Sequence, residues 1–174
     1  YRRGGDRLNV PPHMAMIAEQ TDHNIHAGEA TYDLWLRDRR DHLSLFAATQ
    51  NTRRQSYYGS DMDPDAYGRT SDVVITAGSQ WTHPMDRFLF MPAELVAGLE
   101  YSFNRLHDVT VGYDHDVKQC VRIYSAYLQN EWRDRRWGFL AGARVDKHSM
   151  ISGPIVSPRV NIRYNPVENV NLRA

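Results

Sequence analysis

Histidine and serine are the residues of this chain that most readily carry out acid–base or covalent chemistry, and the chain has 8 histidines. His23 and His26 lie three apart in TDHNIH, a spacing that converges on one metal ion only in a helix or tight turn. No serine has a nearby histidine and aspartate pattern to activate it, and RRGGDR lacks the Lys-Ser/Thr of a phosphate loop. The sequence therefore predicts no catalytic site, no cofactor and no enzyme.

Alternating aspartates form a second candidate metal site in SDMDPDAYG. Asp61, Asp63 and Asp65 have the spacing of a calcium-binding loop. However, Ala66 stands where such a loop has its turn glycine, and Asp72 stands where it has its closing glutamate. We predict no metal site here, although the spacing leaves calcium binding open.

Aromatic and cationic side chains gather in and beside two long segments between predicted strands, at residues 54–70 and 105–118. Arg53, Tyr57, Tyr58 and His107 are the candidate residues for binding a small molecule, since they combine cations with aromatic faces. The alternative is that these segments are rich in tyrosine and charge simply because they are solvated loops.

Composition narrows the class of protein. The chain has 174 residues with 21 basic and 21 acidic side chains, so it offers no net attraction to nucleic acid. Its one cysteine, Cys120, excludes an internal disulfide framework and a cysteine-cluster metal site. No apolar run approaches the roughly 18 residues that a membrane-spanning helix needs.

A two-residue hydrophobic period recurs along the chain, and it predicts an all-β fold. In residues 93–104, Leu95 and Leu99 belong to an apolar face, whereas Glu94 and Glu100 belong to a polar face. We predict one domain, an antiparallel up-and-down meander of about eight long strands, at 28–38, 42–53, 72–82, 93–104, 119–132, 137–147, 156–164 and 170–174.

Strand length and loop length favour a transmembrane β-barrel over a soluble sandwich. The segments mostly run about 9 to 14 residues, whereas strands of soluble domains cluster near 5 to 6. Short connections (37–41, 83–92, 133–136, 165–169) alternate with longer ones (54–70, 105–118, 148–155), as they do at the two rims of an outer-membrane barrel. A soluble β-rich ligand-binding module, such as a lectin-like sandwich, remains the alternative.

Aromatic residues next to the short connections point the same way. Trp81, Trp132, Trp137 and Tyr164 fall on the apolar face by alternation, as an aromatic girdle at a lipid–water interface would place them. Trp35 is the exception, because its alternation places it on the polar face, where it needs a bulge or a lumen contact.

The last 50 or so residues resemble the barrel of a TonB-dependent outer-membrane receptor, in the runs YLQNEWRDRRWGFLAGARVDKHS (127–149) and SPRVNIRYNPVENVNLRA (157–174). The resemblance implies a partial barrel over residues 1–174, with residues 1–26 in an extracellular loop and with the plug domain and the C-terminal strands absent. It also implies a location in the outer membrane of a Gram-negative bacterium. The implied function is energy-coupled uptake of a scarce nutrient such as an iron-siderophore, haem or cobalamin.

The same resemblance implies the partners. These are a small-molecule nutrient complex, the lipid of the outer membrane, and the TonB system, which acts through the plug domain. No nucleic acid is expected. Open strand edges are prone to pairing with another chain, so an isolated piece of barrel is expected to self-associate.

Overall fold

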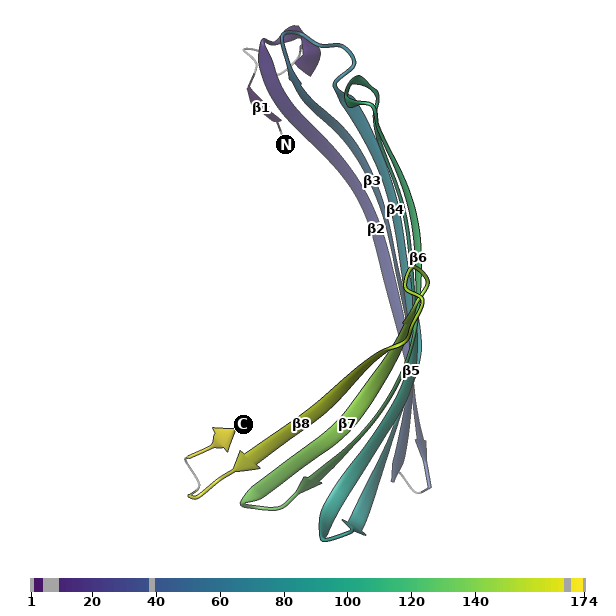
Figure 1. Ribbon diagram of the computed structural model, residues 1–174, viewed down its shortest axis with the longest axis vertical. Helices are drawn as coiled ribbons and strands as arrows, with labels where there is room; N and C mark the ends of the chain where they lie inside the picture. The colour runs from purple at the N-terminus through teal and green to yellow at the C-terminus, as the bar shows by residue number, and fades with distance from the viewer. Residues whose placement is uncertain (1, 5–9, 38–39, 168–169, 174) are drawn as a thin grey trace. The chain divides into compact units, whose positions relative to one another are not determined.

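The chain is almost entirely β-structure in the computed structural model (Figure 1). The structure describes residues 2–4, 10–37, 40–167 and 170–173. Among them, no helix has the length and hydropathy to cross a membrane. The elements are β1 (Arg2–Gly4), η1 (Pro12–Met14), β2 (Ile17–Leu36), β3 (Asp41–Ser60), β4 (Tyr67–Phe88), β5 (Met91–Thr110), η2 (Val111–Tyr113), β6 (His115–Arg133), β7 (Trp137–His148), β8 (Ile155–Tyr164) and β9 (Leu172–Arg173).

The strands follow one another through a single sheet in the order β1 to β9, without a crossover. The pairs β1–β2, β6–β7, β7–β8 and β8–β9 are antiparallel, and Leu128 of β6 lies opposite Ala143 of β7. This arrangement confirms the predicted all-β antiparallel meander. Consecutive strands joined by short turns need no crossover, so the hydrophobic period and the turn positions together determine the strand order.

The strands are longer than the sequence predicts, and the connections are correspondingly shorter. β3 and β5 each have 20 residues, so the loops that follow them shrink to residues 61–66 and 111–114. Polar and charged residues continue the strands because the backbone hydrogen bonds of a paired ladder do not depend on side-chain hydropathy. The prediction of a loop over residues 1–26 is wrong for Ile17 to His26, which belong to β2.

The chain divides into two compact units. The first unit contains Tyr1–Gly28, Ala48–Ile75 and Phe103–Val121, and the second contains Glu29–Ala47, Thr76–Ser102 and Arg122–Ala174.

The first unit has a small core in which Ala18, Tyr57 and Ala66 are buried. The Tyr57 side chain is 1% exposed, and its hydroxyl donates a hydrogen bond to the Asp63 carbonyl oxygen at 3.0 Å. Gly59 leaves the space that this ring occupies, since a Cβ at Gly59 would lie 2.3 Å from the Tyr57 hydroxyl. Glycine and tyrosine therefore fit together as a pair at the end of β3.

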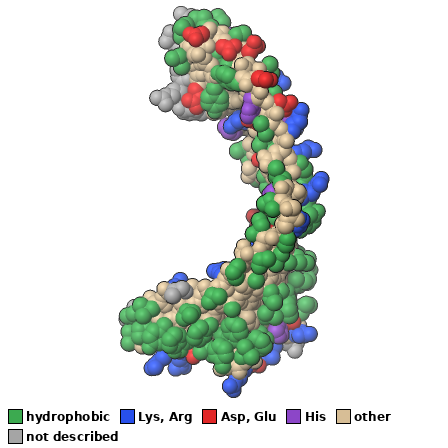
Figure 2. Space-filling model, in the orientation of Figure 1, with side chains coloured by type: hydrophobic (Ala, Val, Ile, Leu, Met, Phe, Trp, Pro, Cys, Tyr) green, Lys and Arg blue, Asp and Glu red, His purple; other side chains and the backbone are tan. Residues whose placement is uncertain are grey.

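The second unit exposes its large apolar side chains. Leu99 is 62% exposed, Leu128 54% and Val160 73%, although all three lie in the middle of strands. Figure 2 shows hydrophobic side chains gathered over the part of the second unit that Figure 1 labels β7 and β8. A water-soluble sheet buries this face in a core, so its exposure indicates an apolar surrounding.

Candidate functional site

The polar side chains of the second unit form one hydrogen-bonded network centred on Arg144. Its guanidinium donates to Glu100 at 3.1 Å, to Asp146 at 2.8 Å and to the Ser125 hydroxyl at 2.8 Å. Ser125 in turn donates to Asp146 at 2.5 Å. These side chains come from β5, β6 and β7 and are partly buried. Alternation places them opposite the exposed leucines, as the sequence predicts.

A cavity of about 780 Å³ lies on this polar face. Its lining includes Glu94, Glu100, Gln129, Arg144 and Arg159, so it presents both signs of charge. The cavity is open and its lining combines charges of both signs with apolar side chains such as Val96 and Pro158, so it lacks the enclosed, mainly apolar form of a typical small-molecule pocket.

An aromatic cluster covers the short turns of the second unit on the apolar face. Trp132 stacks on Phe88 and Phe90 with ring centroids 6.1 and 5.9 Å apart, and Phe90 meets Phe139 edge to face at 6.0 Å. The Trp132 indole N–H donates to the Phe88 carbonyl oxygen at 3.0 Å. The sequence analysis missed the two phenylalanines because it placed both in a loop, whereas Phe88 ends β4 and Phe90 immediately precedes β5.

The cluster continues along β7 and β8. Trp137 stacks on Tyr164 at 4.3 Å and on Phe139 at 5.7 Å. The neighbouring turn is closed by Asp134, whose carboxylate accepts hydrogen bonds from the backbone N–H groups of Trp137 and Arg136, both at 2.7 Å. These two donors hold the pKa of Asp134 below its ordinary value of 3.8.

The two remaining tryptophans stack on histidines. Trp35 stacks on His42 at 4.8 Å, and His42 bonds to Asp33 at 2.9 Å, so Trp35 lies with polar partners and needs no bulge. Trp81 stacks on His83 at 5.4 Å. The stacking partner of Trp81 is therefore a histidine, whereas Trp132 stacks on phenylalanines.

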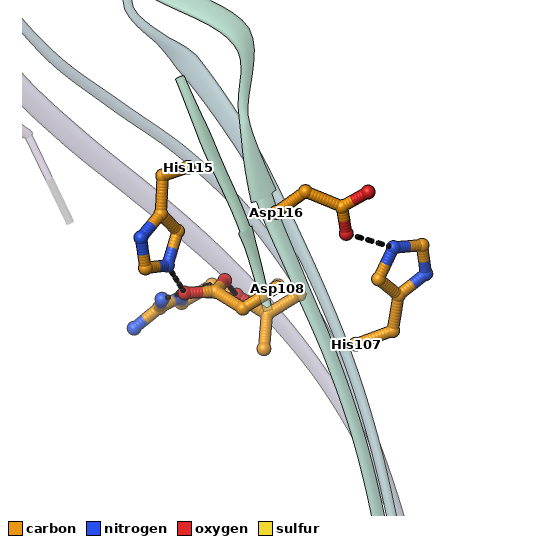
Figure 3. Close-up of polar contacts among 6 residues, drawn as sticks. His107, Asp108, His115 and Asp116 are labelled. Carbon is orange, nitrogen blue, oxygen red and sulfur yellow. Dashed lines mark hydrogen bonds and ion pairs between the residues drawn. The ribbon is translucent and has the colours of Figure 1, made fainter. Parts of the chain in front are cut away.

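In the first unit, four side chains from four strands meet on one face of the sheet (Figure 3). Asp108 of β5 accepts from the Arg54 guanidinium at 3.5 Å, from the Thr70 hydroxyl, and from His115 at 3.1 Å. Arg54 also donates to Thr70 at 3.0 Å. This cluster, which we call the Asp108 cluster, presents a carboxylate, a guanidinium and an imidazole together.

A second histidine–aspartate pair lies on the opposite face of the same hairpin, as Figure 3 shows. The His107 ring bonds to Asp116 at 3.0 Å, and the Lys118 ammonium donates to the other oxygen of Asp116 at 3.0 Å. His107 and Asp108 are adjacent in β5, so their side chains point to opposite faces.

The four predicted ligand-binding residues do not form one group, and none lies in a loop. Arg53, Tyr57 and Tyr58 belong to β3, and His107 belongs to β5. Arg53 and His107 line the same cavity of about 620 Å³. Tyr57 is part of the core, whereas Tyr58 is 44% exposed and accepts a hydrogen bond from the Tyr113 hydroxyl on its carbonyl oxygen at 2.5 Å.

The alternating aspartates follow β3. Asp61 and Met62 both adopt the left-handed backbone conformation, with φ of 57° and 60°. The Asp63 carboxylate accepts from the Asp65 backbone N–H at 2.8 Å, as in an Asx turn. Within the described part of the chain, no three acidic, histidine or cysteine side chains come together in a group that could hold a metal ion.

The chain is similar to known proteins both in sequence and in structure. The sequence profile of the family described as "TonB dependent receptor-like, beta-barrel" matches residues 3–174. No curated protein sequence matches the chain significantly. Among solved structures, the siderophore receptor PirA from Acinetobacter baumannii superposes with a TM-score of 0.65 at 17% sequence identity. That match covers 91% of this chain and 25% of the receptor, so the chain spans about a quarter of the receptor's length.

Proposed function

The chain belongs to the TonB-dependent receptor β-barrel family, and from this we propose that it forms part of an outer-membrane receptor for energy-coupled nutrient uptake. The observation that carries the proposal is the family match over residues 3–174. Receptors of this kind need no catalytic residue, since they only bind and release their cargo.

The apolar face of the second unit supports a lipid-facing surface. Leu99, Leu128 and Val160 are exposed in the middle of strands, and the aromatic cluster around Trp132 lies beside the turns. An exposed apolar band that ends in a girdle of aromatic rings is what the hydrocarbon core and its interface select. A lectin-like sandwich would bury these leucines between two sheets, so the exposed face counts against that alternative.

The opposite, polar face supports a wet lumen. The Arg144 network and the cavity beside it would meet the plug domain, through which the TonB system acts in receptors of this kind. Ion pairs on a face of mixed charge stabilise the strands and leave donors and acceptors for a polar partner.

For nutrient contact we propose Tyr58 together with the Asp108 cluster. Tyr58 and Arg54 are four residues apart in β3, so alternation places them on the same face. The exposed phenol ring and the Arg54–Asp108–His115 groups offer an aromatic surface and hydrogen-bonding groups of both kinds. An iron-siderophore is the cargo we propose first, haem and cobalamin being the alternatives, and the fold-level likeness to a siderophore receptor agrees with this order.

Two experiments on the full-length receptor test the proposal. Membrane fractionation should recover it from the outer membrane, and only with detergent; recovery in the soluble fraction would refute the function. A strain lacking the gene should then grow poorly when a single iron-siderophore, haem or cobalamin is the limiting nutrient.

The nutrient-contact residues are tested in the same strain. Complementation with Tyr58→Ala should weaken nutrient binding, whereas Tyr32→Ala should not, because Tyr32 is 61% exposed on the apolar face of β2. Equal binding by both variants would remove Tyr58 from the site without affecting the proposed function.

A further inference from the structure

The first unit has a cavity of about 620 Å³ whose lining includes Arg54 and Thr70 of the Asp108 cluster but consists mostly of other residues. Its walls carry the cationic side chains of Arg53 and Arg69 and the imidazole of His107. Tyr67 and Val109 supply part of the apolar lining. Convergent cations on apolar walls are the chemistry of a site for an amphiphilic anion.

In the described part of the chain, the guanidinium groups around this cavity differ in whether they have a partner. Within the residues that the structure describes, Arg53, Arg69 and the nearby Arg105 make no side-chain hydrogen bond or ion pair. Arg54, which also borders the cavity, differs because Thr70 and Asp108 occupy its guanidinium. Each free guanidinium keeps the planar set of donors that binds a phosphate bidentately.

The neighbouring cavity adds further basic side chains. A smaller cavity of about 380 Å³ adjoins the first, sharing Ser71 and His107 with it and adding Arg105 and Lys118. The nearby carboxylates include Asp65, in the lining of the larger cavity, and Asp116, which is bound by His107 and Lys118. Asp108 is also near, and it is bonded to Arg54 and Thr70. Figure 2 shows Lys and Arg side chains along the right-hand edge of the first unit. We call the two adjoining cavities together, with Arg53, Arg69, Arg105 and Lys118 in their walls, the basic cavity.

Apolar side chains share the face of the basic cavity. Ile75 lies six residues after Arg69 in β4 and is 39% exposed, and Phe103 lies two residues before Arg105 in β5. Alternation puts each pair on one face of its strand. Phe103 lies four residues after Leu99 in β5, so alternation also places it on the exposed apolar face. A basic patch that continues into apolar residues matches a lipid, whose charged head lies next to its acyl chains.

We propose that the basic cavity binds the phosphate group of an anionic lipid headgroup in the leaflet around the receptor. The free guanidinium groups of Arg53 and Arg69 hold the phosphate, and the acyl chains run over the face of Ile75. This inference rests on the proposed outer-membrane function, because a lipid reaches the cavity only where the chain is embedded in a bilayer.

Lipid retention by the full-length receptor tests the inference. The receptor is reconstituted in nanodiscs of phosphatidylcholine containing phosphatidic acid, and bound phosphatidic acid is measured by native mass spectrometry after detergent transfer. The test variant is Arg53→Gln with Arg69→Gln. The control is Arg54→Gln, because Arg54 is the neighbouring residue of β3 but its guanidinium is engaged in the Asp108 cluster.

We expect phosphatidic acid to bind the double variant about thirtyfold more weakly, since each basic residue near an anionic lipid contributes about a factor of five. The Arg54→Gln control should retain it like the wild type. Equal retention by the double variant would overturn the inference. The inference would also be overturned if the wild type bound inorganic phosphate as tightly as phosphatidic acid, because the cavity would then be a site for soluble phosphate. Outer-membrane recovery of the double variant distinguishes either failure from a failure of the proposed function.

Discussion

Replacing Tyr57 tests the core assigned to the first unit. As a loop residue it would tolerate alanine, but its side chain is 1% exposed and its hydroxyl donates to the Asp63 carbonyl oxygen. Tyr57→Phe removes only that hydrogen bond, at a cost of about 1 kcal/mol. Tyr57→Ala also empties the space between Ala18 and Ala66, and removing a buried aromatic ring costs about 3–5 kcal/mol.

Hydrogen exchange of the full-length receptor in detergent measures this cost locally. The Tyr58 backbone N–H donates to the Ala66 carbonyl oxygen at 3.3 Å, so its exchange reports the opening of this end of β3. At about 1.4 kcal/mol per tenfold, exchange should accelerate about fivefold in Tyr57→Phe and more than about a hundredfold in Tyr57→Ala. Tyr58→Ala is the control, with its side chain 44% exposed. Tyr57→Ala exchanging no faster than this control would refute the assigned core.

Three further predictions concern the second unit. Leu99→Arg should destabilise the membrane-embedded receptor by about 2–4 kcal/mol if Leu99 faces the lipid midplane, whereas Glu100→Gln on the other face should destabilise it less. Urea unfolding in lipid vesicles measures both free energies, and equal destabilisation by the two variants would contradict the assigned faces. Arg144→Met should cost about 1–2 kcal/mol in the same assay because Glu100 loses its cation; an unchanged midpoint would show that the network adds no stability. The pKa of Asp134 is lower in the folded protein, so its ionised carboxylate stabilises the turn at pH values above the ordinary carboxyl pKa, and this stabilisation is lost as the pH falls through the folded-state pKa. Hydrogen exchange at the Trp137 backbone N–H should therefore accelerate below about pH 4. Asp134→Asn should remove this pH dependence, and a pH response that survives the substitution would have another source.

The sequence predicts the fold well because the meander depends on two local signals. The two-residue period gives the faces, and the turns separate the strands, so the strand order and the opposite placement of Leu99 and Glu100 follow without tertiary information. Strand ends are harder to predict. Arg54 and His107 are polar, and nothing in their types shows that the ladder continues through them.

The candidate site depends on contacts between distant residues, which no local signal records. Asp108 and Thr70 are 38 residues apart in the sequence, and Trp132 and Phe88 are 44 apart. Their meeting depends on the register between strands. One residue of slip would move every side chain of a strand to the other face, and the predicted turn lengths were not accurate enough to set that register.

Gly98 has a consequence for how this sequence can change over generations. A Cβ at Gly98 would lie 2.2 Å from the Tyr127 ring, whose hydroxyl donates to the Gln80 side chain at 2.9 Å. A larger residue at position 98 therefore requires the Tyr127 ring to move away or to be replaced by a smaller side chain, and either change releases Gln80. The three positions, on three different strands, are therefore coupled, and a change at one favours changes at the others.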